Sequence, residues 1–105
     1  MNVPVRIADH AQRLAALERA NRVRSARSRL KRQIAAGELT AAEVILGCRW
    51  EIERMPIGEV LVSQPHWGDA RSRHFLLQLR LYEAKTIGSM TPRQRIAAAA
   101  LLTRG

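Results

Sequence analysis

The stretch SQPHWGDARSRHFLLQLRL, residues 63–81, brings a sharp turn, two arginines and an apolar run together. Pro65 and Gly68 break regular structure and predict a turn after a short helix. Asp69 is a good helix N-cap, and the apolar residues after it predict a helix from Asp69 to about Tyr82. A turn that only reverses the chain needs no such charge, whereas a turn pressed against a phosphate backbone does.

The residues after this helix predict a loop and a final helix. Residues 83–90, EAKTIGSM, have the composition of a loop. Thr91 is an N-cap, Pro92 suits the first helical position, and Gln94 completes a capping box. We expect the buried face of the last helix to consist of Ile96, Ala99, Ala100 and Leu102.

The N-terminal third of the chain predicts a flexible arm followed by one long helix. Residues 1–8 are expected to form the arm, and Asp9 is expected to cap a helix over residues 9–36 that Gly37 ends. An apolar stripe recurs at helical spacing only in the second half of this helix, at Val23, Ala26, Leu30 and Ile34. We therefore expect the second half to be docked and the first half to project.

Two short helices are predicted between Gly37 and the turn. Thr40 and Glu43 form a capping box for a helix that ends near Gly47, and Pro56 begins another that ends before Pro65. Trp50, between them, is expected in the core. No segment predicts a strand. We expect an all-α fold in a single domain over residues 1–105, with a long basic helix at 9–36 and a helical bundle at 39–105.

Charge gives the first indication of function. The 105 residues include 18 Lys and Arg against nine Asp and Glu, a formal net charge of +9. No acid interrupts a run of seven cations: Arg19, Arg22, Arg24, Arg27, Arg29, Lys31 and Arg32. A solvated helix usually mixes both signs to gain i,i+4 pairs, so this run favours an external polyanion. A membrane-surface helix would need more large apolar groups opposite the charge, so nucleic acid is the better partner.

Other classes of function find little support in the sequence. Cys48 is the only cysteine, and the chain has neither a signal-peptide core nor an apolar run of about 18 residues, so we expect a cytoplasmic protein without membrane contact. His10, His66 and His74 lack metal-ligand spacing with one another or with Cys48. No catalytic constellation can be argued. We therefore expect no enzyme activity, no metal and no cofactor.

From about Leu14 to Leu102 the chain resembles the actinobacterial, mycobacterial-type integration host factor family of nucleoid-associated proteins. The stretches that carry the resemblance are MPIGEVLVSQP, WGDARSRHFLLQL and RQRIAAAALL. It implies a long N-terminal helix followed by a helix–two-turn–helix unit at about residues 56–82, an arrangement also found in a small-subunit ribosomal protein and in formamidopyrimidine-type DNA glycosylases. It also implies nucleoid association and assistance to a phage integrase in recombination.

The resemblance also implies a DNA-binding site. The predicted minor-groove edge comprises His66, Trp67, Gly68, Asp69 and Ala70. Flanking phosphate contacts are predicted for Arg71, Arg73, Lys85, Thr86, Arg93 and Arg95. The charge run adds Arg22, Arg24, Arg27, Arg29 and Lys31.

Two departures from the family weaken this site. Asp69 stands where the family usually has Lys, and Lys85-Thr86-Ile87-Gly88 replaces an arginine-rich loop. Trp67 is open to two interpretations, a wedge between bases or a cover over the helix junction, and we favour the cover.

Three functions follow as hypotheses. The first is binding of double-stranded DNA with little sequence specificity, by a monomer that bends or bridges duplexes. The second is binding of structured RNA or the ribosome. The third is a phage-encoded interaction protein that acts on a host partner.

Overall fold

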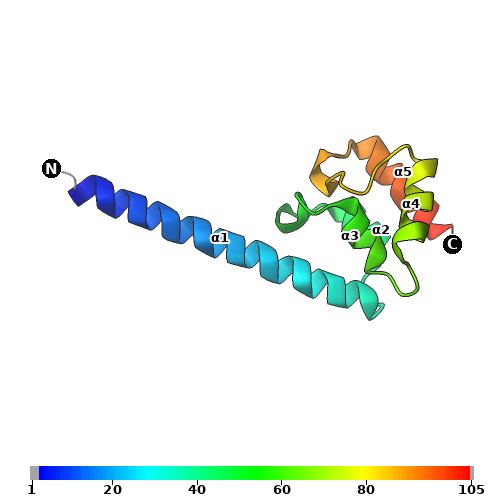
Figure 1. Ribbon diagram of the computed structural model, residues 1–105, viewed down its shortest axis with the longest axis horizontal. Helices are drawn as coiled ribbons and strands as arrows, with labels where there is room; N and C mark the ends of the chain where they lie inside the picture. The colour runs from blue at the N-terminus through cyan, green and yellow to red at the C-terminus, as the bar shows by residue number, and fades with distance from the viewer. Residues whose placement is uncertain (1–2, 105) are drawn as a thin grey trace.

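The protein consists of one long helix and a small helical body (Figure 1). The computed structural model describes residues 3–104. The elements are α1 (Val3–Ala35), α2 (Ala41–Gly47), the 3₁₀ turn η1 (Trp50–Ile52), α3 (Ile57–Val62), α4 (Asp69–Gln78), the 3₁₀ turn η2 (Ile87–Ser89) and α5 (Pro92–Thr103). Within these residues β pairing is limited to one isolated bridge, between Pro56 and Thr86. The all-α prediction is confirmed.

Helix α1 is docked at its C-terminal half and projects at its N-terminal half (Figure 1), as predicted. Leu30 and Ile34 are buried against the body, whereas the helix is exposed from Ile7 to Arg19. The molecule is therefore elongated, with extents of 62 × 27 × 22 Å. Across residues 3–104, no helix has the length and apolar character needed to span a bilayer.

Helix α1 begins earlier than predicted, and its C-terminal end is as predicted. The predicted arm is wrong for residues 3–8, since α1 begins at Val3 and Asp9 lies inside it. Pro4 is compatible with this start because the first helical turn needs no N–H donor; residues 1 and 2 lie outside the described residues. At the other end, Gly37 adopts φ +78° and its N–H and that of Glu38 bond back to the last turn. Glycine ends the helix as predicted.

Helices α2 and α5 pack against each other, and both begin with the predicted capping box. Thr40 Oγ1 accepts from Glu43 N at 3.1 Å, and Thr91 Oγ1 accepts from Gln94 N at 3.1 Å. The predicted inward face of α5 is partly wrong, because Ile96 is 61% exposed. Ala100 is also exposed, and Ala98 is buried together with Ala99. The packed face of α5 thus centres on small alanine side chains, and Ile96 lies outside it.

Two consecutive turns join α3 to α4. Gln64 N donates to Leu61 O and Trp67 N donates to Gln64 O, each at 3.2 Å. The segment is thus literally a helix, two turns and a helix. Gly68, with extended backbone, is the N-cap of α4, so the prediction that Asp69 is the cap is wrong by one residue.

Helix α4 also ends earlier than predicted, at Gln78 instead of about Tyr82. Arg80 adopts a left-handed φ of 57°, and Leu81 N donates to Leu76 O at 3.0 Å. This reversal returns Leu81 to the core, where its side chain is buried. Burial of that apolar side chain compensates for the strained φ of Arg80.

The core lies where α2, α3 and α4 meet the two 3₁₀ turns. Its fully buried large side chains are Ile45, Ile52, Met55, Ile57, Leu61, Leu76 and Ile87. The 83–86 loop fixes the start of α3, since Ile57 N donates to Lys85 O at 2.7 Å and Gly58 N donates to Glu83 O at 3.0 Å. Trp50 is not part of this core, contrary to expectation, because it is 42% exposed.

Candidate nucleic-acid interface

The seven cations of α1 form the α1 basic surface, defined as Arg19, Arg22, Arg24, Arg27, Arg29, Lys31 and Arg32. Lys31 Nζ lies 3.5 Å from Glu59 Oε1. Among the described residues, the other six make no ion pair with an acid, and Arg24 donates instead to the amide oxygen of Asn21. This surface therefore carries a positive charge that acids do not compensate. Its cations three or four residues apart repel each other.

The charge of the chain is concentrated on the same helix. Residues 1–35 contain nine of the 18 basic residues and only two of the nine acidic ones. This segment therefore supplies seven of the nine excess positive charges. The helical body is close to balanced, so the positive field arises mainly from α1.

Trp50 adjoins the α1 basic surface, a contact that sequence reasoning missed. The guanidinium carbon of Arg19 lies 4.6 Å from the centroid of the Trp50 ring, and that of Arg22 lies 6.0 Å away, both within cation–π range. The charged neighbours Arg49 and Glu51 were the available sign that this tryptophan is not in the core.

A hollow of about 600 Å³ runs between α1 and the η1 region. Arg19, Arg24 and Arg27 line it from α1, and Trp50 and Arg54 line it from the body. The Arg27 Nε atom is buried and has no hydrogen-bond partner. Cations thus surround this hollow from both sides, although Glu51 and Glu53 also contribute to its lining.

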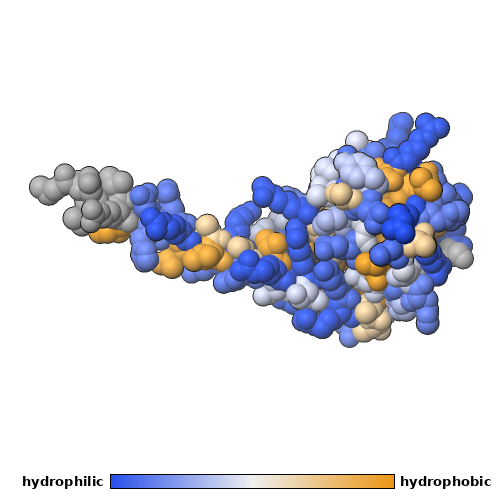
Figure 2. Space-filling model, viewed as in Figure 1, coloured by the Kyte–Doolittle hydropathy of each residue, from blue (hydrophilic) through white to orange (hydrophobic). Residues whose placement is uncertain are grey.

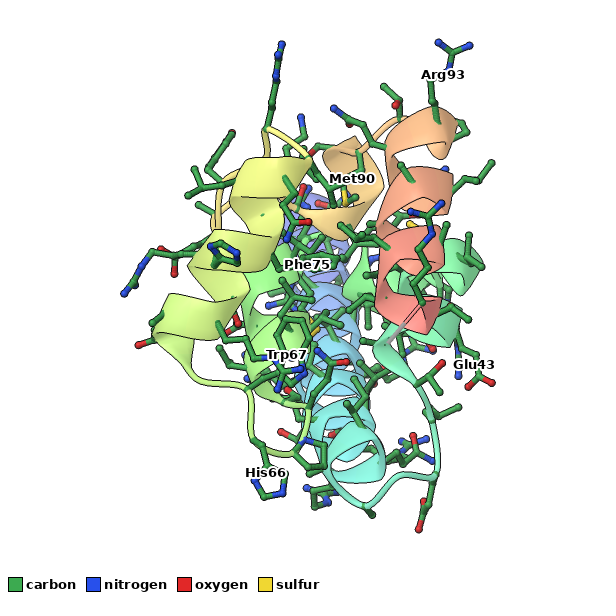
Figure 3. The ribbon with its side chains drawn as sticks, turned by 90° about the vertical axis from the view of Figure 1, so that its right-hand side faces the viewer. Glu43, His66, Trp67, Phe75, Met90 and Arg93 are labelled. Carbon is green, nitrogen blue, oxygen red and sulfur yellow. The ribbon has the colours of Figure 1, made fainter. Side chains whose placement is uncertain are left out.

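The predicted minor-groove residues lie on the two turns and at the start of α4. His66 is exposed with φ 67°, and Trp67 is half-buried against the core. The Trp67 ring packs edge-to-face on Phe75, with centroids 5.6 Å apart, and Arg71 covers it at 4.3 Å. Figure 3 shows Trp67 below Phe75, with His66 at the outer edge of the turn. The prediction that Trp67 covers the helix junction is confirmed.

Gly68, Asp69 and Ala70 form the exposed N-terminus of α4. Gly68 has φ −96°, which any residue adopts, and a Cβ added there would meet nothing within 4 Å. No contact within the chain therefore requires glycine at this position. The first backbone N–H groups of α4 have no partner within the helix, and the residues that carry them are exposed.

Acidic side chains offset part of the charge near this turn. Glu59, Asp69 and Glu83 line one hollow of about 290 Å³. Arg73 Nη1 lies 3.6 Å from Glu83 Oε1, and Glu59 is the partner of Lys31. These acids do not make a metal site, since the described part of the chain has no group of three or more His, Cys, Asp or Glu able to hold an ion.

The remaining predicted contacts lie on other elements, the 83–86 loop and α5. Lys85 and Thr86 are half-buried in the loop that fixes α3. Arg95 Nη1 donates to Met90 O at 2.7 Å, which holds its guanidinium on the protein's own backbone. Arg93 is exposed at the start of α5, and in Figure 3 it lies at the opposite end of the body from His66. The structure does not gather the sequence-predicted residues into one site.

Comparison of the chain with protein-family models, with curated proteins and with solved structures finds no match. The resemblance to the integration host factor family rests on the quoted stretches of sequence alone.

Proposed function

We propose that the protein binds duplex DNA through the phosphate backbone, largely without sequence specificity, with the α1 basic surface as the main contact. The observation that carries this proposal is that six of its seven cations have no acidic partner among the described residues. Such a surface gains free energy by releasing the counterions condensed on a phosphate backbone. Phosphate contacts of this kind position a protein without reading bases.

The α4 turn is the second contact in this proposal. The unpaired N–H groups at the start of α4 and the exposed Arg71 suit phosphate oxygens, and the minor-groove edge is where the family resemblance implies contact. Trp67 would support the turn from below and would not enter the base stack, because Phe75 and Arg71 hold its ring. Nucleoid association and assistance to a phage integrase follow from the resemblance alone and extend the same proposal.

Removal of two cations from the α1 basic surface tests the main contact. We expect Arg29→Gln with Arg32→Gln to weaken binding of a random-sequence duplex. The slope of log K against log salt should fall by about 1.8, at about 0.9 for each lost phosphate contact. Both side chains are exposed and neither has an acidic partner in the described residues, so the fold should be unaffected. Electrophoretic shifts at several salt concentrations would measure the slope.

The matched control removes two cations from the body. Arg80→Asn with Arg104→Gln lowers the net charge by the same amount, and asparagine tolerates the left-handed φ of residue 80. This control should keep the parent slope. Equal losses for both variants would show that only net charge matters and would contradict the proposal, as would affinity that does not change with salt. If duplex RNA competes for the protein better than duplex DNA does, the ligand is RNA and not DNA.

A further inference from the structure

The projecting half of α1 exposes large apolar side chains that nothing in the structure covers. Ile7 is 64% exposed, Leu14 47% and Leu17 58%. Figure 2 shows apolar surface along this part of the helix, between the grey tip and the body. Single exposed leucines are common in folded proteins, so only a regular spacing of these residues would indicate an interaction surface.

The spacing is that of a coiled-coil seam. Ile7, His10, Leu14, Leu17 and Asn21 follow one another at intervals of three, four, three and four residues. These are the a and d positions of a heptad, with Ile7, Leu14 and Asn21 at a. On a helix that turns about 100° per residue, Leu14 lies about 160° around the axis from the docked Leu30. The apolar members of the seam therefore lie on the side of α1 away from the docked face, and Asn21, at its end, borders a hollow that Trp50 and Glu51 also line.

We propose that two copies of this chain pair through the seam as a short parallel coiled coil. Complementary charges beside the seam favour a second copy of the chain, in parallel register, as the partner. Arg13 occupies a g position and Glu18 the e position five residues later, so each Arg13 faces the Glu18 of the other copy. An antiparallel pair would place g against g and lose both attractions.

Asn21 also favours this arrangement. It is exposed at an a position, where only a parallel, in-register pair brings two asparagines together to share a hydrogen bond. Its present contact, with Arg24 on the same helix, lies at the surface and is replaceable by water. A polar a position lowers stability but fixes register and the number of helices.

We expect the dimer to be weak but to form at concentrations that can be reached in solution. The docked half already nucleates α1, so pairing need not meet the cost of starting a helix. Against this, the seam covers only about two heptads, and His10 and Asn21 interrupt it. The two α1 basic surfaces begin at Arg19, within the last turn of the seam, and repel each other. Moderate salt screens that repulsion, so dimerisation should survive salt that weakens DNA binding.

The proposal does not rest on DNA binding and replaces the monomer that the sequence analysis expects. Sedimentation equilibrium without DNA, from about 1 µM to about 1 mM, should show a rise from the monomer mass of 11.8 kDa toward twice that value. Leu14→Ala with Leu17→Ala should weaken the dimer at least tenfold. Leu77→Ala is the matched control, since Leu77 on α4 is 72% exposed but lies outside the seam.

Disulfide trapping tests the orientation. In a Cys48→Ser background, Asn21→Cys should form a disulfide between copies, because parallel register brings the two a positions within bonding distance. Gln12→Cys, at the outer f position, should not. Circular dichroism of each variant would verify that the body is folded. Reversal of the charge pair gives a second test: Glu18→Arg should weaken the dimer several-fold, and adding Arg13→Glu should restore it.

Several results would overturn the proposal. One is a mass of 11.8 kDa throughout the concentration range. Another is a dimer that tolerates the Leu14 and Leu17 substitutions. A third is a dimer that is lost on Ile96→Asp, at the α2–α5 hollow, an open hollow that Leu46, Ile96 and Ala100 line. Equal trapping through residues 12 and 21 would argue against parallel register, and so would failure of the double charge reversal to restore pairing.

Discussion

Two glycines show how differently single residues act in this protein. A Cβ on Gly88 would meet Glu53 O at 2.8 Å and Glu53 Cβ at 2.9 Å, while a Cβ on Gly68 would meet nothing within 4 Å. Gly88 N also donates to Glu53 O at 2.7 Å, so the η2 turn lies directly against the backbone before α3. Gly88 is required by packing within the chain, and Gly68 is not.

We expect Gly88→Ala to lower the free energy of unfolding by about 1–3 kcal/mol, because backbone must move to admit the methyl group. Gly68→Ser should leave it unchanged within about 0.5 kcal/mol, since serine is a favoured N-cap. Urea denaturation of both variants would measure the difference. Equal stability of the two variants would contradict the close packing of η2.

Individual residues were predictable where the cause is local. Thr40 and Thr91 act through residues three positions away, and Gly37 acts through its own backbone, so sequence sufficed for all three. Trp50 and Ile96 were placed wrongly because their burial depends on distant neighbours. The ring of Trp50 lies beside Arg19 and Arg22, and Ile96 lies outside the buried face of α5.

At the scale of elements, capping determines where α5 begins. Thr91 and Gln94 satisfy each other's backbone N–H groups, at 2.9 and 3.1 Å. Thr91→Ala should lower the free energy of unfolding by about 1 kcal/mol, whereas Thr91→Ser, which keeps the hydroxyl, should cost much less. Thermal unfolding followed by circular dichroism would measure both. If the alanine and serine variants were equally stable, the capping box would contribute nothing.

The elements themselves were largely predictable, and their ends less so. Composition and caps located the helices, but α4 ends early because Leu81 returns to the core, a tertiary effect that the left-handed Arg80 makes possible. The start of α1 was predicted too late because Asp9 is a good N-cap residue, whereas the helix begins at Val3 and Pro4 suits its first turn.

The candidate site was predicted in parts. The charge run on α1 could be recognised from sequence, whereas the acids that surround the α4 turn could not. Glu59, Asp69 and Glu83 lie on three separate segments and meet only in the fold.

At the scale of the whole molecule, charge and apolar packing are separated. The body holds the core and is nearly neutral, while α1 carries most of the excess charge and projects beyond the body (Figure 1). The projecting half has a seam for a second copy, and the docked half carries the α1 basic surface. A parallel dimer would hold two such surfaces on diverging helices, which offers a way to grip or bridge duplexes.

Backbone amide chemical shifts, recorded while a random duplex of about 20 base pairs is added, test the central claim most directly. The amides of residues 19–32 should shift most, those of residues 68–71 less, and those around the α2–α5 hollow least. If residues 19–32 stay unchanged while the protein binds the duplex elsewhere, the α1 basic surface is not the DNA contact.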